Sequence, residues 1–175
     1  MKQLVEIIQN HFPINDIDLR KKSLAFISIH QNQAIPLLEW LKTTHGYTAF
    51  VLLTAVDWIE ENRFQLTYLI SNPENFTELG VRVFIDREKA EMVSAHHLWK
   101  SIWVYQRELK EMFGINFPDS PRVNESFILE GWDTIPPYRR DFDTKQYSEE
   151  TYFPRPGRST NDPAKHMKSK LYPKD

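Results

Sequence analysis

Two neighbouring runs of apolar residues, separated by a short polar turn, constrain the fold more than any other feature. Residues 50–58 are almost continuously apolar, which is typical of a strand inside a sheet. In residues 63–70 apolar side chains alternate with others, which is typical of a strand with one buried face. The turn between the two runs is Glu60-Glu61-Asn62. The pattern predicts an antiparallel strand pair, with residues 50–58 central in its sheet.

Other periodic segments add strands and helices to this pair. Residues 23–29 and 78–85 have strand patterns, whereas residues 2–12 and 33–44 place apolar side chains at helical spacing. A third helix, ended by Gly114, is predicted from spacings of three and four among Leu98, Ile102, Tyr105, Leu109 and Met112. The predicted fold class is therefore α+β: a mainly antiparallel sheet packed with amphipathic helices, followed by an extended C-terminal tail.

The composition of the chain changes near Tyr138. Residues 138–175 contain nine Lys or Arg, six Asp or Glu and four prolines, with few aliphatic side chains. Such a segment cannot bury a core of its own, and we expect it to be extended or disordered unless a partner binds it. We therefore predict a globular domain over residues 1–137 and an extended partner-binding tail over residues 138–175.

Missing residue types and patterns limit the chemistry of this chain. Cysteine is absent, which excludes disulfides and cysteine-ligated zinc or iron–sulfur sites. The five glycines are too scattered for a dinucleotide or phosphate-binding loop. A net charge of −2 argues against unspecific attraction to nucleic acid or to an anionic membrane. No apolar run approaches the ~20 residues of a membrane helix, and no signal peptide is evident, so we expect a soluble, unexported protein.

A few polar residues are weak candidates for chemistry. His96 and His97 are adjacent and would point in different directions, so a histidine-based metal site is not expected. Asp57 lies inside an apolar run and is either an acid–base group or, the favoured interpretation, a structural carboxylate paired with an amide or an Arg. Arg107 and Glu111 are four residues apart on the predicted third helix, where a pair contributes roughly 0.2–0.5 kcal/mol.

The most specific pattern lies between Trp103 and Asp141. It contains, in order, Arg107-Glu108, Glu111-Met112-Phe113-Gly114-Ile115, Phe117, Trp132, Pro136, Arg139-Arg140 and Asp141. This order resembles the signature of the thirty-kilodalton subunit family of respiratory complex I, the C subunit of NADH-quinone oxidoreductase, which includes homologous subunits of membrane-bound hydrogenases. Upstream, residues 53–58 are similar to the family's strand with the sequence Ala-Val-Asp. The chain departs from the signature at Gln106, where the family has Glu, and at Glu111, where Asp is usual.

The resemblance implies a cofactor-free accessory subunit with no catalytic or metal site of its own. Such a subunit belongs to the peripheral arm of a complex I-type NADH:quinone oxidoreductase and supports electron transfer to quinone coupled to proton translocation. NADH, FMN, iron–sulfur clusters and quinone are then expected on partner subunits. The implied partners are the quinone-site subunit, of forty-nine kilodaltons in the family, and the adjacent iron–sulfur subunit, at the cytoplasmic face of the membrane, which the chain reaches only through the complex. The equivalent subunit of a hydrogenase-type complex is the alternative.

The end of the third helix and the loop after it form the predicted partner interface. A sharp stop at Gly114 is expected to turn apolar side chains outward, beside a loop with too little structure to hide its own. The interface residues are Arg107, Glu108, Phe113, Gly114, Ile115, Phe117, Trp132, Pro136, Arg139, Arg140 and Asp141. Two functions of other classes remain open: a free-standing enzyme using Asp57, Glu108 or His96, and a peptide- or RNA-binding module with a basic tail.

Overall fold

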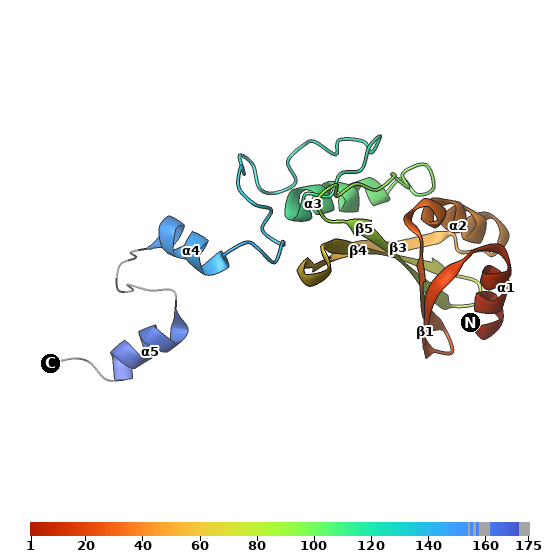
Figure 1. Cartoon of the computed structure of the whole chain (residues 1–175), viewed down its shortest axis with the longest axis horizontal. Helices are drawn as coiled ribbons and strands as arrows, with labels where there is room; N and C mark the ends of the chain where they lie inside the picture. Colours follow the sequence, from red (N-terminus) through yellow and green to blue (C-terminus); the bar gives the residue numbers. More distant parts are fainter. Residues whose placement is uncertain (154, 156, 158–161, 172–175) are drawn as a thin grey trace. The chain divides into compact units, whose positions relative to one another are not determined.

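The computed structural model describes residues 1–153, 155, 157 and 162–171, and the chain divides into two units. The first unit, Met1–Arg139, contains a sheet and the helices α1 to α3. The second unit, Arg140–Asp175, contains the short helices α4 and α5 (Figure 1).

A five-stranded mixed sheet in the order β1-β2-β5-β4-β3 is the scaffold of the first unit. Three of its pairings are antiparallel, and the pairing of β2 with β5 is parallel. The parallel pairing arises because the chain leaves β2, passes through α2, β3 and β4, and returns with β5 beside β2. The strands are β1 (Ile14–Lys21), β2 (Leu24–Ile29), β3 (Ala49–Trp58), β4 (Arg63–Asn72) and β5 (Thr77–Asp86).

The predicted α+β class and mainly antiparallel sheet are confirmed, but the position of β3 is wrong. This strand pairs only with β4 and lies at the edge of the sheet, and β5 is central. Its apolar sequence is misleading because Val56 and Trp58 are 44% and 38% exposed on the face away from the core. The edge strand β1 is absent from the sequence-based prediction because its charged sequence, rich in Asp, Arg and Lys, hides the alternation.

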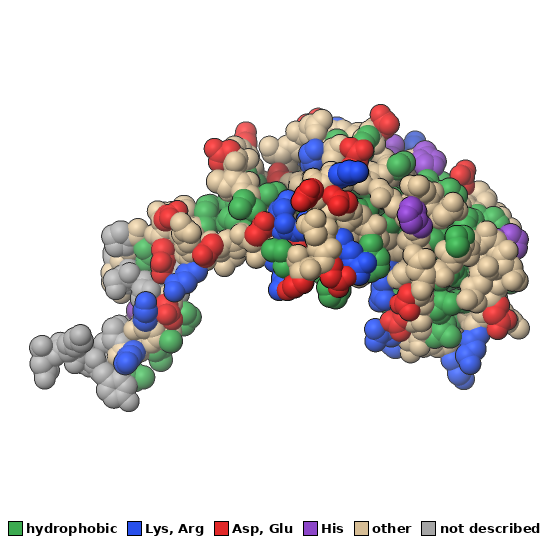
Figure 2. Space-filling view, in the orientation of Figure 1, with side chains coloured by type: hydrophobic (Ala, Val, Ile, Leu, Met, Phe, Trp, Pro, Cys, Tyr) green, Lys and Arg blue, Asp and Glu red, His purple; other side chains and the backbone are tan. Residues whose placement is uncertain are grey.

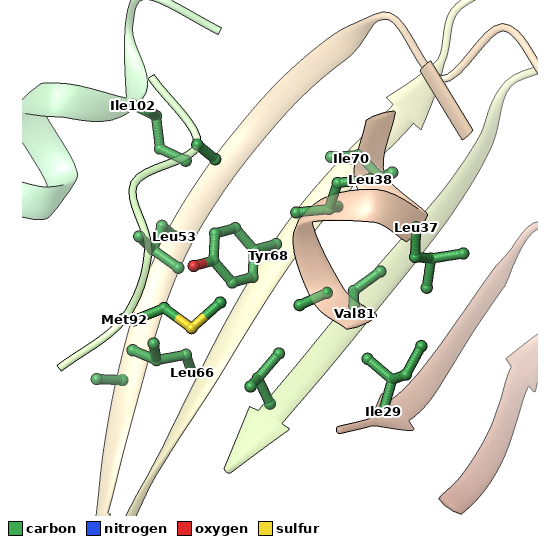
Figure 3. Close-up of a cluster of buried hydrophobic side chains, with 14 of the residues drawn as sticks. Ile29, Leu37, Leu38, Leu53, Leu66, Tyr68, Ile70, Val81, Met92 and Ile102 are labelled. Atoms are coloured by element: carbon green, nitrogen blue, oxygen red, sulfur yellow. The ribbon is translucent and has the colours of Figure 1, made fainter. Parts of the chain in front are cut away.

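The helices of the first unit are α1 (Lys2–His11), α2 (Gln31–Thr44) and α3 (Ile102–Phe113). Helix α2 packs on β5 and α3 packs on β3, both on the same side of the sheet (Figure 1). Figure 3 shows Leu37 and Leu38 of α2 facing strand residues such as Val81. The same layer continues through Leu53 to Ile102 at the start of α3, and both side chains are at most 3% exposed. The predicted helices are present, although α3 begins at Ile102 and Leu98 of the predicted stripe lies before it, and they close the core against one sheet face.

The second unit has helices but no core among its described residues. Its helices are α4 (Thr144–Tyr152) and α5 (Pro163–Leu171), and no described residue from 140 onward is buried. Asp143 caps α4 by accepting hydrogen bonds from the backbone N–H groups of Lys145 and Gln146 at 3.0 and 2.9 Å. The segment expected to be extended thus forms local helices, because composition rules out a buried core but leaves capping and short-range bonds intact.

Candidate partner-binding surface around helix α3

Helix α3 ends at a glycine in the left-handed conformation, as the sequence predicts. Gly114 has φ +79°, and its N–H donates to the carbonyl of Lys110 at 3.0 Å. A Cβ at this position would lie 3.4 Å from Cγ of Pro136, so the later loop folds back directly over the helix end. Both Gly114 and Pro136, two of the predicted interface residues, therefore shape the surface from within the fold.

The apolar residues around this helix end point inward, contrary to expectation. Ile115 and Phe117 are fully buried, and Phe113 is 8% exposed. The Phe113 ring contacts Phe64 of β4 and Tyr138 edge-on, with centroids 6.0 and 5.7 Å apart. The glycine turn directs these side chains back into the core, because the sheet face beneath α3 still has apolar surface to cover. These buried side chains can therefore affect an interface only indirectly, by packing beneath the exposed residues.

The loop of residues 118–137 is held to α3 by one carboxylate. Glu111 accepts hydrogen bonds from three successive backbone N–H groups, those of Phe127, Ile128 and Leu129, at 2.6, 2.8 and 3.0 Å. The predicted pair between Arg107 and Glu111 is wrong, since this carboxylate is occupied by the loop. Glu111 is absent from the predicted interface set. The sequence signal that could have found it is an acidic side chain on the last turns of a helix that precedes a long loop with many unpaired amides.

Arg107 is held between two aromatic rings on the outer side of α3. Its guanidinium lies 5.3 Å from the ring centre of Trp103 and 5.2 Å from that of Phe127. Among the described residues no carboxylate lies within ion-pair distance of Arg107, and its buried Nε has no hydrogen-bond partner. Glu108, the next residue, is half-buried on the same helix.

Beside Arg107 the surface is hollowed. A hollow of about 290 Å³ lies between α3 and the loop, where Arg107, Lys110 and Glu111 face Leu129, Trp132 and Pro136. Trp132 is half-buried, and its indole N–H donates to the carbonyl of Ile135 at 3.1 Å. The rim of the hollow is therefore formed by the loop folded against itself.

Three apolar side chains near the hollow are exposed. Ile128 is 68% exposed, Tyr138 59% and Ile135 46%. Arg139, at the end of the first unit, lies with its guanidinium 5.7 Å from the Phe64 ring. We call the hollow and these three apolar residues the α3 surface. Arg140 and Asp141, the last two predicted interface residues, are exposed and belong to the second unit.

A family model described as "Respiratory-chain NADH dehydrogenase, 30 Kd subunit" matches residues 27–148 of the chain. The chain belongs to this family. It is 29% identical over 144 residues to the C subunit of NADH-quinone oxidoreductase from Moorella thermoacetica, and the match covers 81% of this chain and 95% of that protein. It is 32% identical over 108 residues to the second C/D subunit of NADH-quinone oxidoreductase from Aquifex aeolicus, covering 61% of this chain and 18% of that protein.

Two solved structures share the fold of this member of the thirty-kilodalton family. One is a chain of the membrane-bound sulfane sulfur reductase, an archaeal respiratory membrane complex, with a TM-score of 0.79 and 24% identity over 86% of this chain and 90% of that one. The other is the trypsin-resistant fragment (1–134) of Nqo5, with a TM-score of 0.59 and 19% identity over 69% and 96% of the two chains. At these identities the likeness is one of fold.

Gln106 stands where the signature of the family has a glutamate, and it is completely buried. Its Oε1 accepts hydrogen bonds from the hydroxyl groups of Ser94 and Ser120 at 2.9 and 2.6 Å. The side chain thereby joins the segment before α3 and the loop after it to the inner face of the helix. Its signal in the sequence is a polar residue on the apolar stripe of α3, four residues after Ile102.

Asp57 is a structural carboxylate in this family member, as the favoured interpretation predicts. Its two oxygens accept hydrogen bonds from Nε and Nη2 of Arg87 at 2.8 and 3.0 Å, with both side chains almost completely buried. Within the part of the chain that the structure describes, no group of three or more His, Asp or Glu could hold a metal ion. None of the helices described is long and apolar enough to cross a membrane.

Proposed function

We propose that this chain is a cofactor-free subunit in the peripheral arm of a complex I-type NADH:quinone oxidoreductase. Its role is to hold partner subunits in place while electrons pass to quinone through cofactors on other chains, coupled to proton translocation. The observation that carries the proposal is the α3 surface in a chain of the thirty-kilodalton family. This surface combines exposed apolar side chains, a half-buried Trp and an Arg without an ion-pair partner among the described residues. Trp and Arg are residue types that dominate binding energy at protein interfaces.

The proposed partners are the quinone-site subunit, the forty-nine-kilodalton type, and the iron–sulfur subunit beside it. Support comes from relatives named as C/D subunits in Aquifex aeolicus and in a Hydrogenobaculum species, of which this chain matches 18% and 23%. Fusion of two subunits in one polypeptide is consistent with contact between them, because it keeps the joined parts near one another. The chain would then lie at the cytoplasmic face of the membrane, attached to it only through the complex.

The equivalent subunit of a hydrogenase-type complex is the second candidate. It is supported by the common fold with a chain of the sulfane sulfur reductase, at a TM-score of 0.79. The two candidates differ in the electron donor, which other chains would select, so the attached subunits distinguish them.

Purification of the tagged chain from its own cells in mild detergent tests the proposal. We expect co-purification with a quinone-site subunit and an iron–sulfur subunit, identified by mass spectrometry, and flavin and iron in the assembly. The chain expressed alone should be colourless and should not oxidise NADH. Recovery from membranes and cytosol as a monomer without oxidoreductase subunits would contradict the proposal, as would flavin or iron retained stoichiometrically by the isolated chain.

A surface variant tests whether the complex assembles through the α3 surface. Ile128→Glu places a charge on an exposed side chain of this surface, so the chain should still fold but assemble at least tenfold less well. The matched control is Phe76→Glu, because Phe76 is 82% exposed in the β4–β5 turn, at the other end of the strands from Phe64. Equal assembly of the two variants would show that the α3 surface is not part of the interface.

A further inference from the structure

Arg107 is packed against two aromatic rings, yet no carboxylate of the described residues lies within ion-pair distance of it. The rings of Trp103 and Phe127 lie on the guanidinium at 5.3 and 5.2 Å and limit its motion. Its Nε is buried without a hydrogen-bond partner, which is costly for a charged group. A guanidinium presents its N–H groups in a planar fork that matches the two oxygens of a carboxylate. The site is therefore arranged for an acceptor that the described residues do not supply.

The two carboxylates that line the hollow together with Arg107 already have partners within the chain. Glu111 is bound by the backbone N–H groups of residues 127–129. Oε2 of Glu125 accepts a hydrogen bond from Nε of Arg122 at 2.7 Å and lies 2.6 Å from Nη2 of the same guanidinium. That hydrogen bond is the main cause that lowers the pKa of Glu125, and the charge of Arg107 contributes least. Glu125 is thus committed to Arg122.

The hollow in front of Arg107 has the size to receive one acidic side chain, and it is lined by two cations besides the two carboxylates that are already bound. Its volume of about 290 Å³ lies just below the roughly 300–1,000 Å³ of pockets for cofactors and other small molecules. Lys110 adds a second cation to the lining, with its Nζ donating to Oδ1 of Asn116 at 2.7 Å. Trp132 and Pro136 supply apolar walls, which strengthen a charged contact by keeping water away.

A polyanion is a poorer match than a single carboxylate. The chain has a net charge of −2, and on the face of the first unit in Figure 2 Lys and Arg are interspersed with Asp and Glu. A nucleic acid or an anionic membrane needs a continuous basic field, whereas one carboxylate needs only a local pair of cations.

We propose that an Asp or Glu side chain of a partner subunit inserts into this hollow and binds Arg107, with Lys110 beside it. The inference rests on the proposed function and adds to it the chemistry of the partner residue. Apolar contacts from Ile128 and Trp132 surround the ion pair and exclude water from it.

The test compares Arg107→Gln and Arg107→Lys with the control Arg20→Gln in the assembled complex. Loss of one member of a desolvated charged pair leaves the other charge buried, so Arg107→Gln should raise the dissociation constant about 30-fold or more. Arg107→Lys keeps the charge without the fork and should have an intermediate effect. Arg20→Gln breaks only an exposed pair with Asp18 on β1, away from the hollow, and should change the constant less than about threefold. The melting temperature of each isolated variant checks that the fold is intact.

Coupling with a zero-length carbodiimide identifies the occupant of the hollow. This reagent joins an amine to a carboxylate in direct contact. The amine of Lys110 is available for coupling in the wild-type complex, and Arg107→Lys adds a second amine at position 107. Interchain coupling to an Asp or Glu of a partner subunit supports the inference. Coupling only to Glu111 or Glu125 of the same chain, together with unchanged assembly of Arg107→Gln, overturns it and leaves the proposed function standing. A wild-type chain that joins no oxidoreductase complex overturns the proposed function itself.

Discussion

In the first unit apolar side chains pack against one another, whereas in the second unit the described residues bury none. Residues such as Ile8, Leu37 and Phe117 are completely inaccessible between the sheet and helices α1 to α3. Helix α4 has no buried residue, although it has a capped N-terminus and contains Tyr147 and Tyr152. The first unit therefore has a buried core that can supply folding energy, whereas the described helix α4 has only local structure.

The largest expected effect concerns the contribution of the buried Asp57–Arg87 ion pair to the stability of the first unit. Asp57→Asn removes the charge that pairs with buried Arg87, and an uncompensated buried charge costs about 3–5 kcal/mol. We expect the free energy of unfolding, measured by urea titration of the isolated chain, to fall by about that amount.

The control for Asp57→Asn is Glu125→Gln, because the pair of Glu125 with Arg122 is exposed. Its removal should lower the free energy of unfolding far less than Asp57→Asn does, because water screens an exposed pair. Similar losses in both variants would show that the buried pair has no special weight in the stability of the first unit.

A smaller effect is expected at the contact between α3 and the loop of residues 118–137. Glu111→Gln weakens the hydrogen bonds to the N–H groups of Phe127, Ile128 and Leu129, each of which now has a charged acceptor. Hydrogen bonds to charged groups contribute about 1.5–3 kcal/mol, and Gln retains part of this. Amide exchange of residues 127–129 should therefore accelerate roughly tenfold, with a smaller change in the β4 amides.

Glu108→Gln is the neighbouring control, since the N–H groups of residues 127–129 donate to Glu111 and not to Glu108. Its amide exchange should match that of the wild type. Equal protection of residues 127–129 in all three proteins would mean that the loop is held by its apolar contacts and not by Glu111.

Periodic patterns were sufficient to predict the helices and most strands, because burial on one face leaves a period in the sequence. They failed for β3, where apolar residues on the open sheet face imitate a buried strand, and for β1, whose charges mask its pairing. The candidate site was only partly predictable. Arg107 and Trp132 follow from the family signature, but the binding of Glu111 to three loop amides depends on the path of a loop without periodicity.

The smallest expected effect is confined to the second unit. Asp143→Ala removes the side chain that accepts from the N–H groups of Lys145 and Gln146, and loss of such a cap costs a helix about 1 kcal/mol. Since α4 buries no residue, this loss should raise amide exchange in residues 144–152 and leave the unfolding of the first unit unchanged. Exposed Thr151→Ala, near the other end of the same helix, serves as the control and should change neither quantity. A fall of several degrees in the main melting transition of Asp143→Ala would show that α4 shares stability with the first unit. In the assembled complex the same variant should lose its effect on exchange, because contacts from a partner would then order α4 more strongly than its cap.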